Sequence, residues 1–513
     1  MSTDAAPAPE PTTETAPTSP EPRTGRRRPD RPNVVFVITD QQRFDTVAAL
    51  GHDHVDTPHL DRLVAEGTAF TRTYVTAPSC APSRASLFTG MYPHSTGVLR
   101  NDDVWHHSWV ERLAAAGYRC TNVGKMHTYP YETSIGFHER HVVENKDRGH
   151  PDLPFFLDSW DKALHVRGLE KPDRVSLRGR EDYRENLGAF AWSLPEDMHP
   201  DHFVGDLARW WLERYLGGSP ETTGSRPGEQ PFFLQVGFPG PHPPYDPVPR
   251  YLERYADRDV PLPHRTPEDL AAQPEPLQEL RRAHQAVDHD AVVHLEDPSD
   301  EQLRRQRRHY LANVTMLDDQ VGALREVLER LGVWDDTVLV FTSDHGDCLN
   351  DHGHSQKWTM YDPSVRVPAI VAGPGVAEGR RVEGLTSMMD LGPTVLELAG
   401  VEVPHWMEAQ SLVPALRGEE WPGREHAFSE HARDHILTGT AMMTMVRDDR
   451  WKLVSFVDSD EGQLFDLEAD PHEERTLWDH PACAEVKQRL LEVMARWRTE
   501  SALRSADWAA DVR

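Results

Sequence analysis

One stretch of the sequence decides how the rest of the chain is interpreted. It reads Ser79-Cys80-Ala81-Pro82-Ser83-Arg84-Ala85-Ser86-Leu87-Phe88-Thr89-Gly90. Pro82 suits the first position of a helix, where a missing N–H costs nothing, and Gly90 suits the left-handed residue that closes one. Cys80 would then lie where unpaired N–H groups and the positive end of the helix dipole favour an anion. A thiol there is predicted to be a nucleophile with a low pKa. The alternative is a small, buried hydrophobic residue.

The pattern Cys-x-Pro-Ser-Arg, followed by Leu87, Thr89 and Gly90, resembles the signature of the type I sulfatases, within the alkaline-phosphatase-like superfamily. The match is complete from Cys80 to Gly90. The resemblance implies that a separate formylglycine-generating enzyme, which reads Cys-x-Pro-x-Arg, converts Cys80 to formylglycine. The other residues that the family needs are distributed along the chain.

Two apolar strands each lead into residues that bind metals. Asn33–Thr39 is typical of a strand buried on both faces and leads into Asp40-Gln41, where sulfatases place their first metal ligands. Thr337–Thr342 leads into Ser343-Asp344-His345 in the same way. In open α/β sheets ligands gather beyond the carboxyl ends of strands, so the two half-sites could meet at one cation if their strands are neighbours. The predicted ligands of one divalent cation are Asp40, Gln41, Cys80, Asp344 and His345.

The two half-sites depart from the commonest sulfatase pattern, which has Asp-Asp and Asp-Asn where this chain has Asp40-Gln41 and Asp344-His345. An amide in place of a carboxylate, and an imidazole in place of an amide, leave fewer negative charges on the cation. All-oxygen sites suit calcium, whereas an imidazole tolerates manganese and other transition ions. Calcium (Ca2+) is the first choice and manganese (Mn2+) the second.

Further residues resemble the catalytic residues of the family. Gly124-Lys125-Met126-His127 follows the short segment 118–123 and resembles the family's Gly-Lys-x-His. His242 lies in a proline-rich loop after the predicted strand 232–238, and this loop limits its freedom as a pre-organised site requires. Lys357 lies in a run that resembles the family's second lysine segment. Asn101 could reach the same site, although Asn more often serves in turns.

The resemblance implies a role for each of these side chains. A hydrated formylglycine at position 80 would attack sulfur with one hydroxyl, aided by the metal, and its second hydroxyl would then lose a proton and expel sulfate. Arg84 can reach back to position 80, and Lys125, Lys357 and His242 can hold the sulfuryl oxygens. His127 would bond to the diol, and His242 or Lys357 would protonate the leaving oxygen. The predicted substrate-binding residues are Asn101, Lys125, His242 and Lys357.

Strands that alternate with capped helices predict an α/β fold with a large, mostly parallel sheet flanked by helices. After residue 403, short strands at 445–447, 451–454 and 463–467 and a final amphipathic helix predict a smaller α+β domain with an antiparallel sheet. The predicted organisation is a disordered tail at 1–31, a catalytic domain at 32–403 and a C-terminal subdomain at 404–513. Residues 138–230 match no known segment and are expected to shape the substrate site. Core packing is expected for Trp160, Trp192, Trp210 and Trp211.

The composition excludes several classes of function. The chain has 513 residues and a net charge of −29, which makes it a poor candidate for nucleic-acid binding. It lacks the broad cationic face expected for gripping a long sulfated polymer. No stretch approaches the roughly 20 apolar residues of a membrane span. Four cysteines do not make a disulfide framework in so long a chain, so a cytoplasmic setting is expected.

Two rival functions remain open. A phosphonate monoester or phosphodiester hydrolase of the same superfamily uses the same formylglycine, but has uncharged hydroxyl residues in place of Lys-x-His, so Lys125 and His127 favour a sulfatase. A non-catalytic binding protein on this fold would have lost a nucleophile, a metal ligand or a lysine, and each of those positions is filled here. The small sulfated substrate, whether an aryl, choline, sugar or alkyl sulfate, is left open, as is the oligomeric state.

Overall fold

The computed structural model describes residues 30–144, 146, 157–218, 230–432, 436–437 and 439–511. The predicted disordered tail at 1–31 lies outside these residues except for its last two. Within the described ranges, no helix combines the length and the apolar character that crossing a membrane requires.

In the described residues, one large sheet of nine strands has the order β4-β3-β5-β1-β6-β7-β2-β8, with β9 beside β2. Its pairings are parallel except those of β7 with β6 and with β2. The predicted mostly parallel sheet is confirmed. The strands are β1 (Asn33–Asp40), β2 (Gly67–Tyr74), β3 (Arg119–Gly124), β4 (Glu139–Val142), β5 (Phe232–Pro241), β6 (Thr337–Ser343), β7 (Arg366–Ala372), β8 (Arg380–Val382) and β9 (Thr386–Ser387).

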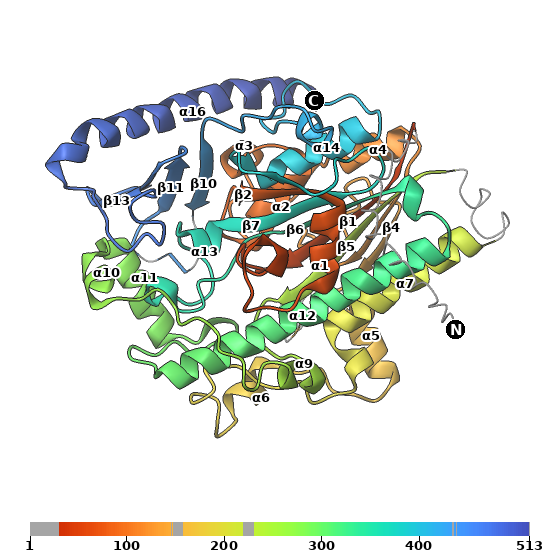
Figure 1. The fold of residues 1–513 in the computed structure, drawn as a ribbon, viewed down its shortest axis with the longest axis horizontal. Helices are drawn as coiled ribbons and strands as arrows, with labels where there is room; N and C mark the ends of the chain where they lie inside the picture. The colour runs from red at the N-terminus through yellow and green to blue at the C-terminus, as the bar shows by residue number, and fades with distance from the viewer. Residues whose placement is uncertain are drawn as a thin grey trace, which may run out of the picture.

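Helices cover both faces of this sheet, so the fold is a helix–sheet–helix sandwich. One face carries α1 (Pro58–Glu66), α7 (Pro200–Gly217) and α12 (Asp300–Arg330), and the other carries α2 (Cys80–Thr89) and α14 (Leu391–Leu398). Figure 1 shows α7 and α12 side by side along one side of the sheet. In the central strand β1, Phe36 and Ile38 belong to the apolar cluster of α2 and α14, whereas Val35 and Val37 belong to that of α7 and α12. Burial of both faces explains why β1 is continuously apolar.

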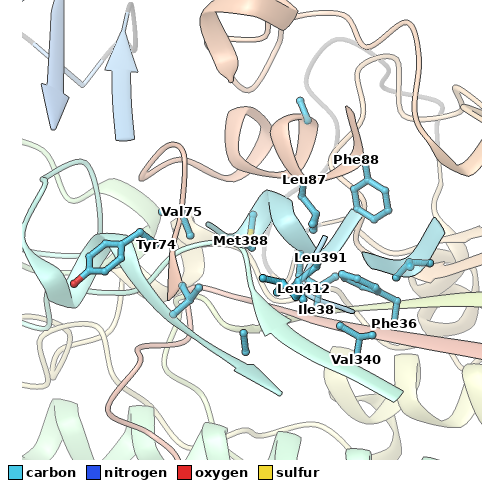
Figure 2. Packing of buried hydrophobic residues seen from close by; sticks show 14 of the residues in the cluster. Phe36, Ile38, Tyr74, Val75, Leu87, Phe88, Val340, Met388, Leu391 and Leu412 are labelled. Atoms are coloured by element: carbon cyan, nitrogen blue, oxygen red, sulfur yellow. The ribbon is translucent and has the colours of Figure 1, made fainter. Parts of the chain in front are cut away.

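Helix α2 is buried along its whole length, because all ten of its residues lie inside the protein. Figure 2 shows its Leu87 and Phe88 near Phe36 of β1 and Leu391 of α14, and the rings of Phe36 and Phe88 are 6.1 Å apart at their centroids. The helix begins at Cys80, two residues before the start that its proline suggested. It ends as predicted at Gly90, whose φ is +75° and whose N–H donates to the carbonyl of Ser86.

The C-terminal part forms a separate antiparallel sheet, as predicted. In the described residues its order is β10 (Ala427–Ala432), β11 (Met442–Arg447), β12 (Trp451–Phe456) and β13 (Gly462–Asp466), and the first of these was not predicted. The long helix α16 (Ala484–Asp511) lies across this sheet in Figure 1. Its Trp497 stacks on Phe428 with ring centroids 4.4 Å apart, which fixes the helix to β10.

The unmatched segment 138–230 contains β4, α5 (Ser159–Val166), α6 (Arg174–Arg178) and α7 among its described residues. Trp160, Trp192 and Trp211 are buried in the cluster that α7 shares with the sheet, so the expected core role of these three is confirmed. Trp210 is 43% exposed, which contradicts that expectation, because neighbouring residues of a helix point in different directions and Trp211 takes the inner position.

Candidate active site

Four neighbouring parallel strands, β3, β5, β1 and β6, end at the same edge of the large sheet. Asp40 is the last residue of β1, and Lys125, His242 and Asp344 are the first residues after the other three strands. Backbone hydrogen bonds continue the sheet at this point: His242 N–H donates to the carbonyl of Asp40 at 3.1 Å, and Asp344 N–H donates to that of Thr39 at 3.2 Å. The sheet therefore brings predicted residues together from positions about 300 residues apart in the chain.

A group of metal-binding atoms lies at this edge. Each of Asp40, Cys80, Asp344 and His345 offers one ligand atom, and these four atoms all lie within 4.8 Å of one another in the buried interior. His345 Nε2 is 3.2 Å from Cys80 Sγ and 3.6 Å from Asp40 Oδ1. The two predicted half-sites thus meet at one place. Two carboxylates, an imidazole and the residue at position 80 are a donor set that fits a divalent cation.

The imidazole of His345 is oriented for such a role. Its Nδ1 lies 2.9 Å from the carbonyl oxygen of Gly346. A carbonyl can only accept a hydrogen bond, so Nδ1 must carry the proton. Nε2 is then left with its lone pair toward Cys80, as a metal-binding histidine requires. Burial, and to a lesser degree the charge of Lys357, lower the pKa of His345 to about 4, so the imidazole is neutral at pH 7.

Three buried cations surround these acids. Lys125 Nζ pairs with Asp40, Arg84 Nε donates to Asp344 Oδ2 at 2.7 Å, and Lys357 Nζ lies 3.0 Å from Cys80 Sγ. Burial alone would raise the pKa of Asp40, but the charges of Lys125 and, more weakly, Lys357 hold it well below its usual range. Asp40 therefore stays ionised inside the protein.

The thiol of Cys80 does not have the low pKa that the helix N-terminus suggested. Burial raises its pKa to about 11, with the carboxylate of Asp40 adding to the effect and Lys357 and Lys125 opposing it. The prediction of a thiolate nucleophile was therefore wrong. Desolvation in a wholly buried helix outweighs the dipole at its start. An unmodified thiol in this place is a poor nucleophile at pH 7.

The remaining predicted residues lie around this group. Asn101 Oδ1 accepts the backbone N–H of Ala81 at 3.1 Å, which places it at the N-terminus of α2 beside Cys80. His242 is partly exposed, with 15% of its side chain accessible, and burial lowers its pKa well below the usual value. The backbone N–H of His127 donates to a carboxylate, that of Glu144, at 3.0 Å. The bond predicted between His127 and the nucleophile stays a prediction.

The chain matches two known protein-family models. Residues 32–401 match the family model described as Sulfatase, and residues 350–500 match one described as N-sulphoglucosamine sulphohydrolase, C-terminal. The chain belongs to the sulfatase family. It is 31% identical to a choline-sulfatase of Rhizobium meliloti, over 88% of this chain and 83% of that protein. It is 29% identical to an arylsulfatase of Clostridium perfringens, over 86% of this chain and 89% of that protein.

This sulfatase also resembles solved structures of the superfamily. The phosphonate monoester hydrolase of Agrobacterium radiobacter superposes with a TM-score of 0.76 at 26% identity, over 92% of this chain and 96% of that one. The resemblance to the type I sulfatases and the predicted fold are confirmed by these relatives. The protein is a sulfuric ester hydrolase, of a family that generally carries a metal ion and a formylglycine.

Gln41, the fifth predicted ligand, is fixed from three sides in this sulfatase. Its backbone N–H donates to Asp344 Oδ1 at 3.0 Å, its Oε1 accepts from Lys357 at 3.1 Å, and its Nε2 donates to Asp347 Oδ2 at 2.7 Å. Its φ of +71° is unusual for a residue other than glycine and marks a backbone held by its surroundings. Sequence reasoning missed Asp347, although it lies three residues after Asp344 and the same run carries the second half-site.

Two further acids reach the site and were also missed. The carboxylate of Glu144, just after β4, lies behind the Lys125–His127 loop, and Asp290 Oδ2 is 3.7 Å from His242 Nε2. Arg174 of α6 forms an ion pair with Asp290, so the unmatched segment does extend to the edge of the active site. In the sequence these acids look like ordinary surface residues. The positive φ of Asp290, +51°, is visible only in the fold.

Proposed function

We propose that this sulfatase hydrolyses a small sulfate monoester to an alcohol and inorganic sulfate, with Cys80 as the precursor of formylglycine. The observation that carries the proposal is the convergence on Cys80 of two carboxylates, a neutral imidazole and three buried cations. A cysteine kept protonated by burial has little use as a thiolate, whereas the same position suits a nucleophile made by modification. The aldehyde hydrate of formylglycine would supply the attacking oxygen.

A divalent cation would be held by Asp40, Asp344, His345 and residue 80, with Gln41 as the fifth ligand. Calcium is the proposed ion and manganese the alternative, because oxygen donors predominate but one imidazole is present. When bound, the cation would lower the pKa of the nucleophile and offset negative charge on the sulfuryl group.

The chain's own residues supply the remaining chemistry. Lys125 pairs with Asp40 and Lys357 lies beside Cys80, where both would hold sulfuryl oxygens, and Arg84 fixes Asp344. Asn101 fixes the first turn of α2. His242 is the proposed donor of a proton to the leaving oxygen, because it is more exposed than Lys357.

A second function has a specific observation in its favour. The likeness to a phosphonate monoester hydrolase covers nearly the whole of both chains. That activity would require the site to accept an extra ester substituent beside the transferred group. Lys125, which is paired with Asp40 in the interior, favours a sulfate monoester because it directs a fixed positive charge at the transferred group.

A substrate panel separates the two functions. The enzyme, co-expressed with the formylglycine-generating enzyme that we propose as its partner, is assayed on aryl, choline, sugar and alkyl sulfates, on a phosphonate monoester and on a phosphodiester. We expect the best sulfate monoester to exceed the best of the other esters in kcat/KM. A higher kcat/KM for a phosphonate or a diester than for every sulfate would overturn the proposal.

Removal of the metal provides a separate test. Exhaustive chelation should abolish turnover, and addition of calcium, or less effectively manganese, should restore it. The readout besides activity is thermal unfolding: the ion should raise the melting temperature of the wild type, because it binds only the folded site. Asp344→Asn should lose this increase. An increase that survives in Asp344→Asn would place the ion elsewhere.

Two predictions on organisation extend the proposal. The proposed boundary between the catalytic domain and the C-terminal subdomain lies at residues 403 and 404, after α14 and before the small sheet. We also propose a cytoplasmic location, which agrees with the finding that all four cysteines are free thiols.

A further inference from the structure

Two charged residues that follow β4, Glu144 and Lys146, are buried beside the active site, with exposed fractions of 1% and 3%. A charged side chain in the interior must have partners that repay its desolvation. The carboxylate of Glu144 lies 4.0 Å from Arg140 of β4 and accepts backbone N–H groups of the loop after β3. The partners of Lys146 lie in the loop after β5. These are the two loops that carry Lys125 and His242.

Glu144 binds the backbone of the first loop. Its carboxylate accepts the N–H of His127 at 3.0 and 3.2 Å and that of Met126 at 3.4 Å. His127 has a φ of +61°, a conformation that side-chain-bearing residues rarely adopt without support. The loop is thus held in a strained form by an acid that lies two residues beyond the end of a neighbouring strand.

Lys146 binds the second loop. Its Nζ donates to the carbonyl oxygens of His242 and Pro244, both at 3.1 Å, and to Asp246 Oδ1 at 2.6 Å. These are the three donor positions that an ammonium group has, so Lys146 is fully bonded. Lys146 therefore holds the carbonyl of His242, while the imidazole Nε2 lies 3.7 Å from Asp290 Oδ2.

We propose that Glu144 and Lys146 act as a clamp that sets the position of the Lys125 loop relative to the His242 loop. Among the described residues, the backbone pairing of β3 with β5 ends with the bond from Lys125 N–H to the carbonyl of Gly237. The clamp restores a connection there through two side chains from one short stretch. Both are positioning residues, since they act through the loops that they hold. The inference rests on the proposed roles of Lys125 and His242.

Loss of Lys146 and loss of Glu144 should change kcat/KM in different ways. Lys146 positions His242, the proposed proton donor, and loss of a donor harms poor leaving groups most because they need the proton most. Glu144 positions the loop of Lys125, which would hold the transferred group whatever the alcohol. Lys146→Met should therefore steepen the dependence of kcat/KM on leaving-group pKa, whereas Glu144→Ala should lower kcat/KM by the same factor for every leaving group.

The experiment uses a series of sulfate esters whose alcohols differ in pKa, with formylglycine content measured for each variant. We expect Lys146→Met to lose on the order of 10²-fold on the poorest leaving group and about tenfold on the best. For Glu144→Ala a uniform loss of about tenfold or more is expected. Lys171→Met is the matched control, because Lys171 belongs to the same segment but pairs with Asp161. It should retain wild-type rates.

Hydrogen exchange provides a readout that is independent of chemistry. The amides of Met126 and His127 should exchange faster in Glu144→Ala, and that of His242 faster in Lys146→Met. Unchanged exchange in both variants would overturn the clamp. If exchange rises but neither Lys146→Met nor His242→Asn changes the leaving-group dependence, the clamp stands and the proposed role of His242 fails. If His242→Asn steepens that dependence and Lys146→Met does not, the clamp is refuted. If Glu144→Ala or Lys146→Met does not fold, Glu144→Gln and Lys146→Gln replace them in the same measurements.

Discussion

Replacement of Cys80 by serine is expected to reduce kcat by about 10³-fold or more, the scale on which removal of a nucleophile acts. The proposed conversion to the aldehyde requires the cysteine of the Cys-x-Pro-Ser-Arg pattern, so a serine at position 80 would not be converted. Its single hydroxyl also leaves no second oxygen to drive the release of sulfate. Cys80→Ala should be equally inactive, because the neighbouring cations and acids can bind the ester but cannot attack it.

Mass spectrometry checks the same claim directly. The peptide that contains position 80 should be lighter by about 18 Da in the active wild type, as the conversion of a cysteine to formylglycine requires. Cys483→Ser is the control, because this cysteine lies just before α16, in the cluster of the small sheet. Its loss should leave both the mass change and the rate intact. Full activity in Cys80→Ala would refute the assignment.

Lys125→Ala is expected to lower kcat by about 10²-fold, the scale of losing one pre-organised contact that stabilises charge in a dry site. The ammonium group is the strongest of the charges that hold the pKa of Asp40 low, so its removal also raises that pKa and weakens the proposed metal site. The measurement is kcat and KM on the best sulfate ester, with calcium in excess so that a loss of metal affinity does not mimic the effect.

Lys487→Ala, in α16, where the ammonium group lies over the ring of Trp478, is the control and should keep the wild-type rate. A nearly silent Lys125→Ala, together with a preference for diesters over every sulfate, would make Lys125 a structural partner of Asp40. The phosphonate and diester hydrolase would then be the better function.

The elements that could be predicted are those whose sequence pattern is set by the residues of the element itself. β1 and β6 are buried on both faces, so their sequences are continuously apolar, and the residues at their carboxyl ends follow from parallel geometry. β10 was missed because Ala-Phe-Ser-Glu-His-Ala contains buried polar residues, among them Glu430, which only the neighbouring helices satisfy. The low pKa predicted for Cys80 failed for the same reason, since desolvation depends on what packs around α2.

The acids that tertiary packing recruits could not be predicted. Asp347 contacts Gln41 and Tyr245, and Glu144 contacts a loop from another strand, so neither role exists until the chain has folded. A carboxylate in a sequence is most often a surface residue, and no periodicity distinguishes these from the others. By contrast, the predicted ligands after β1 and β6 belong to short continuous patterns, and the structure brings Asp40, Asp344 and His345 together.

The complete burial of α2 would limit the time at which the proposed modification of Cys80 can take place. Once folding is complete, an enzyme that must grip the backbone around this residue has no access to it. The packing partners in α14, however, are synthesised about 300 residues later, which at roughly 5–20 residues per second leaves on the order of 15–60 s. The proposed modification would therefore have to precede the packing of α2, and slower translation after residue 90 should raise the fraction of active molecules.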